Sequence, residues 1–439
     1  MGFQYGTMAL KRKGCNMNYL RILFLMAGLW LLPAEIMSAE TSLQEQINET
    51  PSGGKLIIPS GTYEGPIELS KPIAIEAEKG AVIQYSGRET AVSISGQDVS
   101  VRNLTIKTSS DKAVAAVQLT GDGHKLLDLD IVTGATAIRM DQASQVQIEG
   151  TTITGQFGEH AIDLNESNDN VFAENSIKRV EDGFYVEDSD RNTFTGNQVS
   201  ESHYGFHIMY SEEAALIDNK VADSFTGAMV MGASGGIIEG NEFKNNNENV
   251  HAQGLLLYDS TGVRIAENQL INNRIGLFIE QADANEVKDN LFLSNYIAVQ
   301  FLESANNIIS ENDFRLNLNE AQAIKSSQNE VNGNYWDSAV KVDVNGDQYS
   351  DLPYEADPYF LSLTDEVPEY QLFFQSPGML ILQKMLKSTS GDLLMDKDPL
   401  MKPQAMEVTR GGSPWQVWVI ATAMFGVSAS LFLIGRKKS

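Results

Sequence analysis

The sequence predicts an all-β fold, a right-handed parallel β-helix built from coils of about 22 residues. Three observations predict it. Short segments of the form Asn-x-apolar recur at spacings of 22, 22, 22, 27, 22, 22 and 22 residues. Between them lie runs of alternating apolar and polar residues, too short for helices. Gly, Asn, Asp and Ser separate these runs. The segments begin at Asn175, Asn197, Asn219, Asn241, Asn268, Asn290, Asn312 and Asn334.

The repeat replaces the roughly three domains that a length of 439 residues would otherwise favour. Weaker copies around Ile106, Ile131 and Ile153 extend it toward the amino terminus, so we expect one solenoid over residues 40–340. Each recurring Asn is expected at a turn, where its amide bonds to the coils above and below as a ladder. A leucine-rich repeat has a similar period, but its L-x-x-L-x-L consensus is absent.

Solenoid ends need caps, and the sequence offers one at each end. Residues 41–47 form a short amphipathic helix with Leu43 and Ile47 on one face, expected to cover the first coil. Beyond Trp336 the period stops, and residues 341–387 are expected to form an irregular cap that ends in an apolar amphipathic helix. Residues 388–414 are rich in Ser, Gly, Asp, Lys and Pro, as in a linker.

The two ends of the chain are expected to direct it to a membrane. Residues 1–39 have the order of a secretory signal: basic residues, a short apolar run and small residues before a cleavage point after Ala39. Met17 is a second candidate start codon. Residues 415–435 include an uncharged run of 20 residues, enough for one membrane-spanning helix, and a basic cytoplasmic tail follows at 436–439. These features predict an extracytoplasmic protein anchored to the cytoplasmic membrane.

Charge excludes one class of partner. The chain has 58 acidic and 32 basic residues, a net charge of −26. Each end carries +3, which leaves −32 on residues 40–435. Nucleic acid is therefore not an expected partner, because phosphate binding requires a basic surface. Cys15 is the single cysteine and lies in the expected signal, which excludes an intramolecular disulfide and a thiolate metal site.

One strand of each coil follows the pattern small-apolar-x-apolar-x, in which the third and fifth residues point outward. In two successive coils these outward residues are His207 and Met209, then Met229 and Met231. The four should form a two-by-two block, with about 5 Å between coils and about 7 Å along a strand. Thioether and imidazole groups select Cu(I) over zinc or calcium, so the Met/His block is a candidate Cu(I) site.

The surface beside the Met/His block is apolar. The next coils place Leu256, Tyr258 and Phe278 outward, which predicts a partner-binding surface. His203, and His251 in the coil with five extra residues, are candidate contributors to the same surface. Two alternatives remain open: a loop covers this face, or a partner binds there without metal. His124 and His160 are interpreted as ordinary surface or turn histidines.

A second outward column is acidic and gives a rival hypothesis. It contains Asp141, Asp163 and Glu187, with Arg139 and Tyr185 nearby. Carboxylates placed in this way serve as acid and base, or hold calcium, in parallel β-helices that cleave polysaccharides. A solvated acidic face is the simpler interpretation on a chain of this charge.

A third cluster follows the last repeat. Asp343, Asn345, Asp347 and Asp351 occupy relative positions 1, 3, 5 and 9, as in the start of an EF-hand loop. Position 6 is Gln348 and position 12 is Tyr354, so the EF-hand pattern is incomplete. The alternatives are a structural calcium ion that staples the cap and a plain turn.

Several motifs resemble those of the NosD family, the extracytoplasmic maturation proteins of nitrous oxide reductase. The resemblance covers about residues 43–387. It includes the glycine-rich opening at residues 53–65, Gly-Phe-His-Ile-Met-Tyr-Ser at 205–211, Asn-Tyr-Trp-Asp at 334–337, the following acidic loop with Leu-Pro-Tyr at 352–354, and Ser376-Pro377 with its apolar segment.

The resemblance implies a non-enzymatic role in assembling the copper centres of nitrous oxide reductase. It implies four partners: the permease and the ATPase subunits of an ABC transporter, a copper-chaperone lipoprotein and the reductase. The expected carboxy-terminal membrane span departs from the family pattern. The alternative function is a cell-surface carbohydrate-binding or polysaccharide-cleaving enzyme, and a third is adhesion or structural display.

Overall fold

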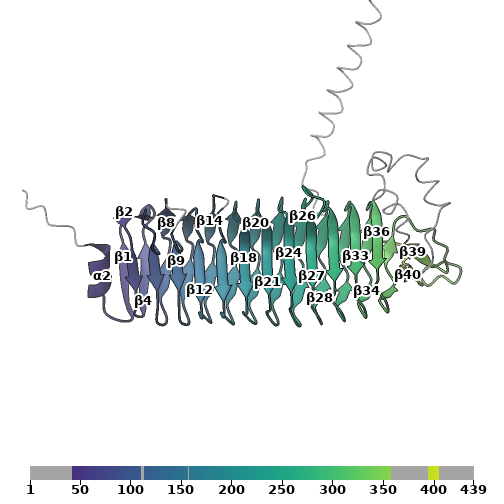
Figure 1. Ribbon diagram of the computed structural model, residues 1–439, viewed down its shortest axis with the longest axis horizontal. Helices are drawn as coiled ribbons and strands as arrows, with labels where there is room; N and C mark the ends of the chain where they lie inside the picture. Colours follow the sequence, from purple (N-terminus) through teal and green to yellow (C-terminus); the bar gives the residue numbers. More distant parts are fainter. Residues whose placement is uncertain (1–41, 110–112, 157, 357–393, 405–439) are drawn as a thin grey trace, which may run out of the picture.

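The computed structural model describes residues 42–109, 113–156, 158–356 and 394–404. They form a long rod of stacked coils in which each coil before the last contributes strands to three sheets (Figure 1). The sheets contain 15, 13 and 12 strands, and we name them sheets A, B and C. Strand pairing is parallel throughout, except between the last two strands of sheet A. The expected parallel β-solenoid with coils of about 22 residues is confirmed.

Sheet A runs along the whole rod. Its strands, in spatial order, are β1(Gly54–Ile58), β4(Ile73–Ala77), β7(Ser100–Arg102), β10(Lys125–Leu127), β13(Gln147–Glu149), β16(Val171–Ala173), β19(Thr193–Thr195), β22(Ala215–Ile217), β25(Ile237–Glu239), β28(Arg264–Ala266), β31(Glu286–Lys288), β34(Ile308–Ser310), β37(Glu330–Asn332), β40(Leu394–Asp396) and β39(Tyr354–Ala356).

Sheets B and C form the other two sides. The strands of sheet B are β2(Gly61–Glu64), β5(Ala81–Tyr85), β8(Thr105–Thr108), β11(Asp130–Val132), β14(Thr152–Thr154), β17(Ser176–Lys178), β20(Gln198–Ser200), β23(Lys220–Ala222), β26(Glu242–Lys244), β29(Gln269–Ile271), β32(Leu291–Leu293), β35(Asp313–Arg315) and β38(Tyr335–Trp336). Those of sheet C are β3(Ile67–Leu69), β6(Val92–Ile94), β9(Val117–Leu119), β12(Ile138–Asp141), β15(Ile162–Asn165), β18(Asp182–Glu187), β21(Tyr204–Met209), β24(Thr226–Met231), β27(Gln253–Tyr258), β30(Ile275–Glu280), β33(Ile297–Leu302) and β36(Asn319–Ile324).

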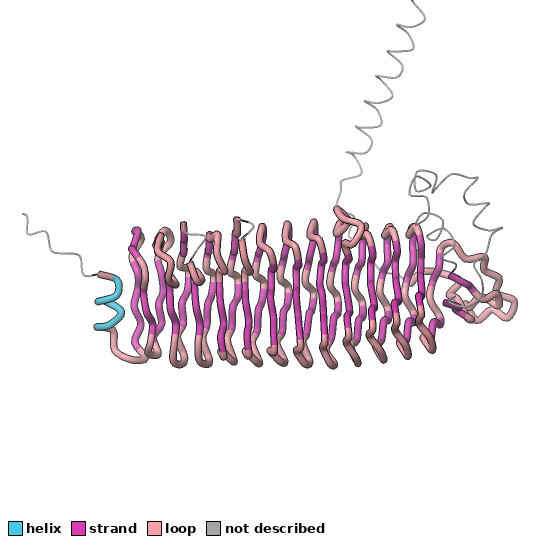
Figure 2. Tube along the Cα trace, viewed as in Figure 1, coloured by secondary structure: helices cyan, strands magenta, loops and turns pink. Residues whose placement is uncertain are grey.

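Short loops separate the strands all along the rod (Figure 2), because each coil must turn at three corners. In the coil between β26 and β27 the Asn repeat lengthens from 22 to 27 residues, and the extra residues form an exposed loop around Val250. The small first position of the sheet C pattern also has a geometric cause. A Cβ atom on Gly205 would lie 2.4 Å from the carbonyl oxygen of Gly227 in the next coil.

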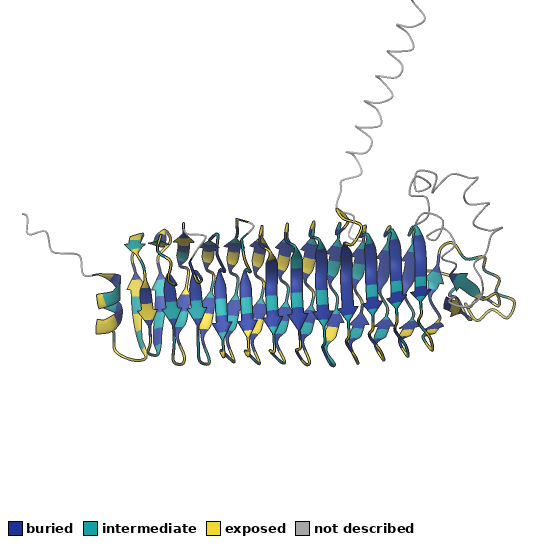
Figure 3. Ribbon diagram, viewed as in Figure 1, coloured by how far each residue is buried: buried dark blue, intermediate teal, exposed yellow. Residues whose placement is uncertain are grey.

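The core is a continuous apolar column inside the rod, with buried strand faces along its whole length (Figure 3). Aromatic rings stack along it at the coil spacing. Phe184 and Phe206 are parallel with ring centroids 4.9 Å apart, and Phe314 stacks on Trp336 at 4.0 Å. Such alignment follows from the register, because equivalent residues of adjacent coils lie about 4.8 Å apart.

The expected asparagine ladder is confirmed. Asn197 is fully buried, and its Nδ2 donates to Asn219 Oδ1 at 2.9 Å and to the Phe172 carbonyl at 2.9 Å. Its Oδ1 accepts from both the backbone N–H and the Nδ2 of Asn175. A second ladder, not predicted from the sequence, has the same construction and consists of Asn246, Asn273, Asn295 and Asn317.

The amino-terminal cap is the helix α2(Leu43–Glu49), as expected. Ser42 caps it through a reciprocal pair of hydrogen bonds with Glu45, and its buried face carries Leu43 and Ile47. The side-chain amide of Gln44 bonds both backbone groups of Glu68 on β3. That amide therefore occupies the edge of sheet C where another strand would otherwise pair.

The carboxy-terminal end is closed by residues from a distant part of the sequence. β40 pairs with β37 and, in antiparallel fashion, with β39. Residues 394–404, which belong to the expected linker 388–414, thus take part in closing the solenoid. The ring of Tyr354 stacks on Trp336 with centroids 4.8 Å apart, which covers the end of the aromatic column.

Several expectations fall outside the described residues: the signal at 1–39, the apolar helix expected before residue 387, and the membrane span and tail at 415–439. Within the described part of the chain, helices are too short and too polar to cross a membrane.

Candidate functional site

The outward columns of sheet C follow the strand register that the sequence predicted. His207 pairs with Met229, and Met209 pairs with Met231, on the adjacent strands β21 and β24. The next strand continues both columns, with Leu256 beside Met229 and Tyr258 beside Met231. The following strand, β30, places Phe278 beside Leu256. The structure therefore brings the Met/His block and the expected apolar surface together on one face.

This face is less open than the alternation alone predicted. Met209 is only 8% exposed and Leu256 only 9%, whereas His207, Met229 and Met231 are half-buried. An outward position on a strand does not by itself fix exposure, because side chains of neighbouring coils lie only about 4.8 Å apart. The Met/His block is therefore less exposed than its outward positions suggested.

His207 is held on three sides. Its Nδ1 lies 3.3 Å from Oδ2 of Asp182, a residue of β18 that is 3% exposed. The ring of Tyr185 meets it edge-on, with centroids 5.3 Å apart, and the ring of Tyr204 lies 4.6 Å away. Among the described residues, none hydrogen-bonds to its Nε2. The ring is thus fixed through Nδ1, and within the described ranges Nε2 has no hydrogen-bond partner.

His160 is part of the same cluster, which corrects its interpretation as an isolated histidine. Its Nδ1 lies 3.1 Å from Asp182 Oδ2, and its ring stacks on Tyr185 with centroids 4.5 Å apart. Burial lowers the pKa of His160, but the attraction of Asp182, Asp163 and Glu159 outweighs it and raises that pKa. Burial raises the pKa of Asp182, yet the two imidazoles hold it below its ordinary value.

Asp182 is not among the residues predicted from the sequence. The signal was the register itself, because Asp182 precedes the small residue Gly183 just as His160 precedes Ala161 in the coil before. Residues at the start of sheet C strands were not read as a column, although they stack as the outward positions do.

The other three histidines have contacts of their own. His203 comes four residues before His207, stacks on Phe225 at 4.7 Å, and has its Nδ1 3.4 Å from Glu181. His251 is exposed and lies two residues before β27 begins. His124 is fully buried, not on the surface: its Nδ1 accepts from the Val99 N–H, and its Nε2 lies 3.1 Å from the Thr120 carbonyl.

Each carboxylate of the acidic column accepts a hydrogen bond from a neighbouring side chain. Asp163 accepts from Arg139 Nε at 3.0 Å, Asp141 from Gln118 at 3.2 Å, and Glu187 from the Tyr185 hydroxyl at 3.3 Å. Burial, together with Glu187, Asp163 and Asp182, raises the pKa of Tyr185 to about 12. Tyr185 therefore stays protonated at neutral pH, which does not suit a general base.

In the acidic loop after the last coil, backbone N–H groups donate to the loop's own Asp and Asn side chains. Asp343 accepts from the N–H groups of Gly346 and Gln348, and Asp351 accepts from the Val344 N–H. Asn345 and Asp347 each accept from a backbone N–H two residues ahead. These bonds describe consecutive Asx turns.

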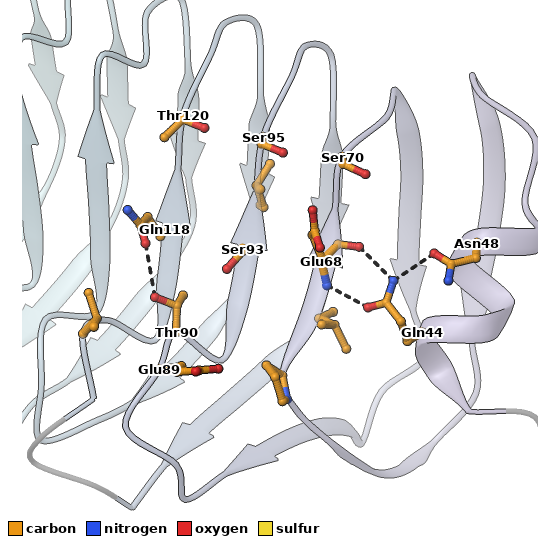
Figure 4. Close-up of a pocket in the computed structure, with 14 residues that line it drawn as sticks. Gln44, Asn48, Glu68, Ser70, Glu89, Thr90, Ser93, Ser95, Gln118 and Thr120 are labelled. Atoms are coloured by element: carbon orange, nitrogen blue, oxygen red, sulfur yellow. Dashed lines mark hydrogen bonds between the residues drawn. The ribbon is translucent and has the colours of Figure 1, made fainter.

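Within the described ranges, groups of three or more His, Cys, Asp or Glu side chains suited to hold a metal ion are absent. The Met/His block offers a different donor set, with one imidazole and three thioethers. A groove of about 850 Å³ lies at the amino-terminal end of sheet C, between α2 and the first coils. Figure 4 shows hydroxyls, amides and two carboxylates lining it, among them Glu68, Glu89 and Gln118.

Residues 144–354 match the model of a family described as periplasmic copper-binding protein (NosD). The chain contains a NosD domain. This domain begins just before β13 and ends at Tyr354, so it includes the Met/His block, Asp182, the apolar surface and the acidic loop. Copper binding is the property that this description gives to the family.

Comparison with other proteins adds nothing more specific than this domain. No curated protein matches the chain. Among solved structures, it is similar to the periplasmic alginate epimerase AlgG at 11% identity and a TM-score of 0.48, covering 66% of this chain and 82% of that one. It is also similar to PfbA, a surface adhesin of Streptococcus pneumoniae, at 12% identity and a TM-score of 0.43, covering 65% and 84%. Likenesses this weak carry no functional argument.

Proposed function

We propose that this chain is an extracytoplasmic maturation factor that binds or passes Cu(I) on the Met/His block during assembly of the copper centres of nitrous oxide reductase. The observation that carries the proposal is the pairing of His207 with Met229 and of Met209 with Met231 on adjacent strands within the NosD domain. One imidazole and three thioethers are neutral, soft donors, which favour Cu(I) over harder divalent ions.

The surroundings of the block suit a cation that is held briefly. A net charge of −32 on residues 40–435 attracts cations to the solenoid. The four donors are neutral and half-buried or buried, so they add no fixed charge that would hold copper by attraction alone. This combination favours capture and release of copper cargo over permanent storage.

The partners in this proposal are the permease and ATPase subunits of an ABC transporter, a copper-chaperone lipoprotein and the reductase. Leu256, Tyr258 and Phe278 continue the columns of the block, so a partner that docks on them would lie next to the donors. In this proposal, residues 415–435 anchor the chain to the membrane and keep the solenoid on the outer side, with the ABC transporter subunits.

Titration of the purified full-length protein with Cu(I) under anaerobic conditions, in competition with a coloured Cu(I) chelator, tests the site. We expect His207→Ala and Met229→Leu each to weaken Cu(I) binding by at least about tenfold. Met395→Leu is the matched control, because Met395 is exposed on β40, far from the block. Unchanged affinity in both block variants would contradict this site.

A cellular experiment tests the role. In a denitrifying host that lacks its own copy of this protein, the copper content of purified nitrous oxide reductase should recover with the wild-type chain and stay low with His207→Ala. Full recovery with a His207→Ala, Met229→Leu double variant would refute copper transfer through the block.

The alternative function is binding or cleavage of a polysaccharide along sheet C. The observation in its favour is the Arg139–Asp163 pair beside His160 and Tyr185 on the same face. Turnover of an acidic or neutral glycan that disappears in Asp163→Ala would establish it. Each carboxylate of the column accepts a hydrogen bond from a neighbouring side chain, which speaks against its use as a free acid or base.

A further inference from the structure

One buried carboxylate contacts the coils on both sides of its own coil in the NosD domain. Oδ2 of Asp182 lies 3.3 Å from His207 Nδ1 and 3.1 Å from His160 Nδ1. The residue is 3% exposed, and in the described structure its other oxygen, Oδ1, is buried without a hydrogen-bond partner. A buried carboxylate that is only partly satisfied costs free energy, so its presence needs an explanation.

The fold does not supply that explanation. Asp182 shares its register position with Tyr204, Thr226, Gln253, Ile275, Ile297 and Asn319 in the later coils. Hydroxyl, amide and aliphatic side chains all fill this position in a coil of the same shape. A carboxylate is therefore not required to build the solenoid, and it stands where it contacts the histidine of the Met/His block.

We propose that Asp182 is a positioning residue for copper binding: it accepts the Nδ1–H of His207 and so leaves the Nε2 lone pair as the metal donor. The inference rests on the proposed function, since it assigns a role within the same site. Metal-binding histidines usually donate their second ring N–H to a carboxylate or carbonyl, which fixes both the tautomer and the ring orientation. The described residues leave Nε2 of His207 free for this role.

The surrounding rings support the same assignment. Tyr185 meets His207 edge-on and Tyr204 lies beside its ring, so rotation of the imidazole is restricted on two sides. Asp182 itself lies below the surface, at the start of β18, and serves as a hydrogen-bond acceptor and not as a ligand. The donor set that meets the metal thus stays neutral, which preserves the preference for Cu(I).

The experiment uses Asp182→Thr in the full-length protein, because Thr226 already occupies this register position two coils later. The first measurement is made without copper. Nitrogen-15 NMR of histidine-labelled protein, with His207 assigned by its loss in His207→Gln, reports which ring nitrogen carries the proton. We expect Nδ1–H in the wild type and a shift toward Nε2–H in Asp182→Thr.

The second measurement is Cu(I) affinity by chelator competition, where Asp182→Thr should weaken binding about 10- to 100-fold. Glu181→Thr is the matched control, because it removes the neighbouring exposed carboxylate beside His203 and should change neither reading. Asp182→Asn, with the residue type found at position 319, is a second variant and should give a partial loss of affinity. Urea unfolding of each variant reports any loss of fold.

The two proposals fail in different ways. An Nε2–H tautomer of His207 in the wild type would overturn the positioning role even if Cu(I) binds normally. So would an Nδ1–H tautomer that persists unchanged in Asp182→Thr. A tautomer that shifts without any loss of Cu(I) affinity would overturn it as well. Absence of Cu(I) binding in the wild type would instead refute the copper function, whereas the copper-free NMR result would still decide whether Asp182 orients His207.

Discussion

The carboxylate of Asp396 takes the place of the next asparagine after Asn334. Its Oδ2 accepts from the backbone N–H of Asn334 at 2.8 Å and from Asn334 Nδ2 at 3.1 Å, and Trp336 Nε1 donates to the same oxygen at 2.9 Å. Its Oδ1 accepts from the Gly333 N–H. A residue 62 positions away in sequence therefore ends the ladder, with hydrogen bonds to its last rung.

Asp396→Ala should destabilise the carboxy-terminal end. Asp396 is fully buried, and its loss leaves several N–H donors without an acceptor, which costs on the order of 3 kcal/mol. Urea unfolding of the full-length protein measures the effect, and Trp336 fluorescence reports on this end. Asp398→Ala, at an exposed site two residues later, should be neutral. Equal stability of the two variants would contradict a closing role for Asp396.

Asn197→Ala should weaken the middle of the solenoid. The change removes four hydrogen bonds of a fully buried amide and leaves donors and acceptors in both neighbouring coils unpaired. We expect a loss of about 2–4 kcal/mol in the free energy of unfolding. Gln198→Ala, at the adjacent exposed position, is the control. A loss below 0.5 kcal/mol would mean that the ladder is not a main source of stability.

Gly205→Ala tests the close approach of coils in sheet C. The new methyl group would lie 2.4 Å from the Gly227 carbonyl oxygen and 2.5 Å from Val221 Cγ1, so the coils must move apart. We expect this to lower the free energy of unfolding by about 1–3 kcal/mol. Because β21 carries His207, Cu(I) affinity should fall along with stability. Gly61→Ala, where the nearest atom lies 3.8 Å away, should be tolerated in thermal unfolding.

Glu320 should make the free energy of unfolding depend on pH. It lies on β36, the last strand of sheet C, and accepts from Tyr354 and Ser338. Burial raises its pKa to about 7, although those two hydrogen bonds oppose the shift. The folded state thus binds the proton more tightly than the unfolded state, whose carboxyl titrates near 4.5.

The contribution of Glu320 is therefore fully present below pH 4.5 and is lost as the pH rises through about 7. Its size is on the order of 3 kcal/mol. Urea unfolding at several pH values should show this fall in the wild type and a flatter profile in Glu320→Gln. Identical profiles for the two proteins would show that Glu320 does not titrate in this range.

The sequence predicted the repeating parts well, for a physical reason. Parallel coils of constant length put equivalent residues side by side, so the pairs His207–Met229 and Met209–Met231 could be read from spacing alone. The helix around Leu43 and Ile47 followed from its amphipathic pattern. Both depend only on local periodicity.

Other parts depend on contacts that periodicity does not encode. Asp396 pairs with Val331 across a long stretch of sequence. The segment that contains Asp396 has the composition of a linker, so the sequence did not predict this pairing. Met209 is only 8% exposed although the alternation of its strand places it outward, because alternation gives direction and not exposure. Asp182 and His160 meet at the corner of a coil, where the two-residue period of a strand does not predict direction.

The constant coil height also sets a fixed distance. Five coil steps separate β21, which carries His207, from β36 at the closed end, and at about 4.8 Å a step this amounts to about 24 Å along the axis. The coils between them are joined by backbone and asparagine hydrogen bonds and leave little freedom for bending. The solenoid thus acts as a rigid spacer, and deleting one whole 22-residue coil between β24 and β36 would move the donors closer to the cap by one step without altering them.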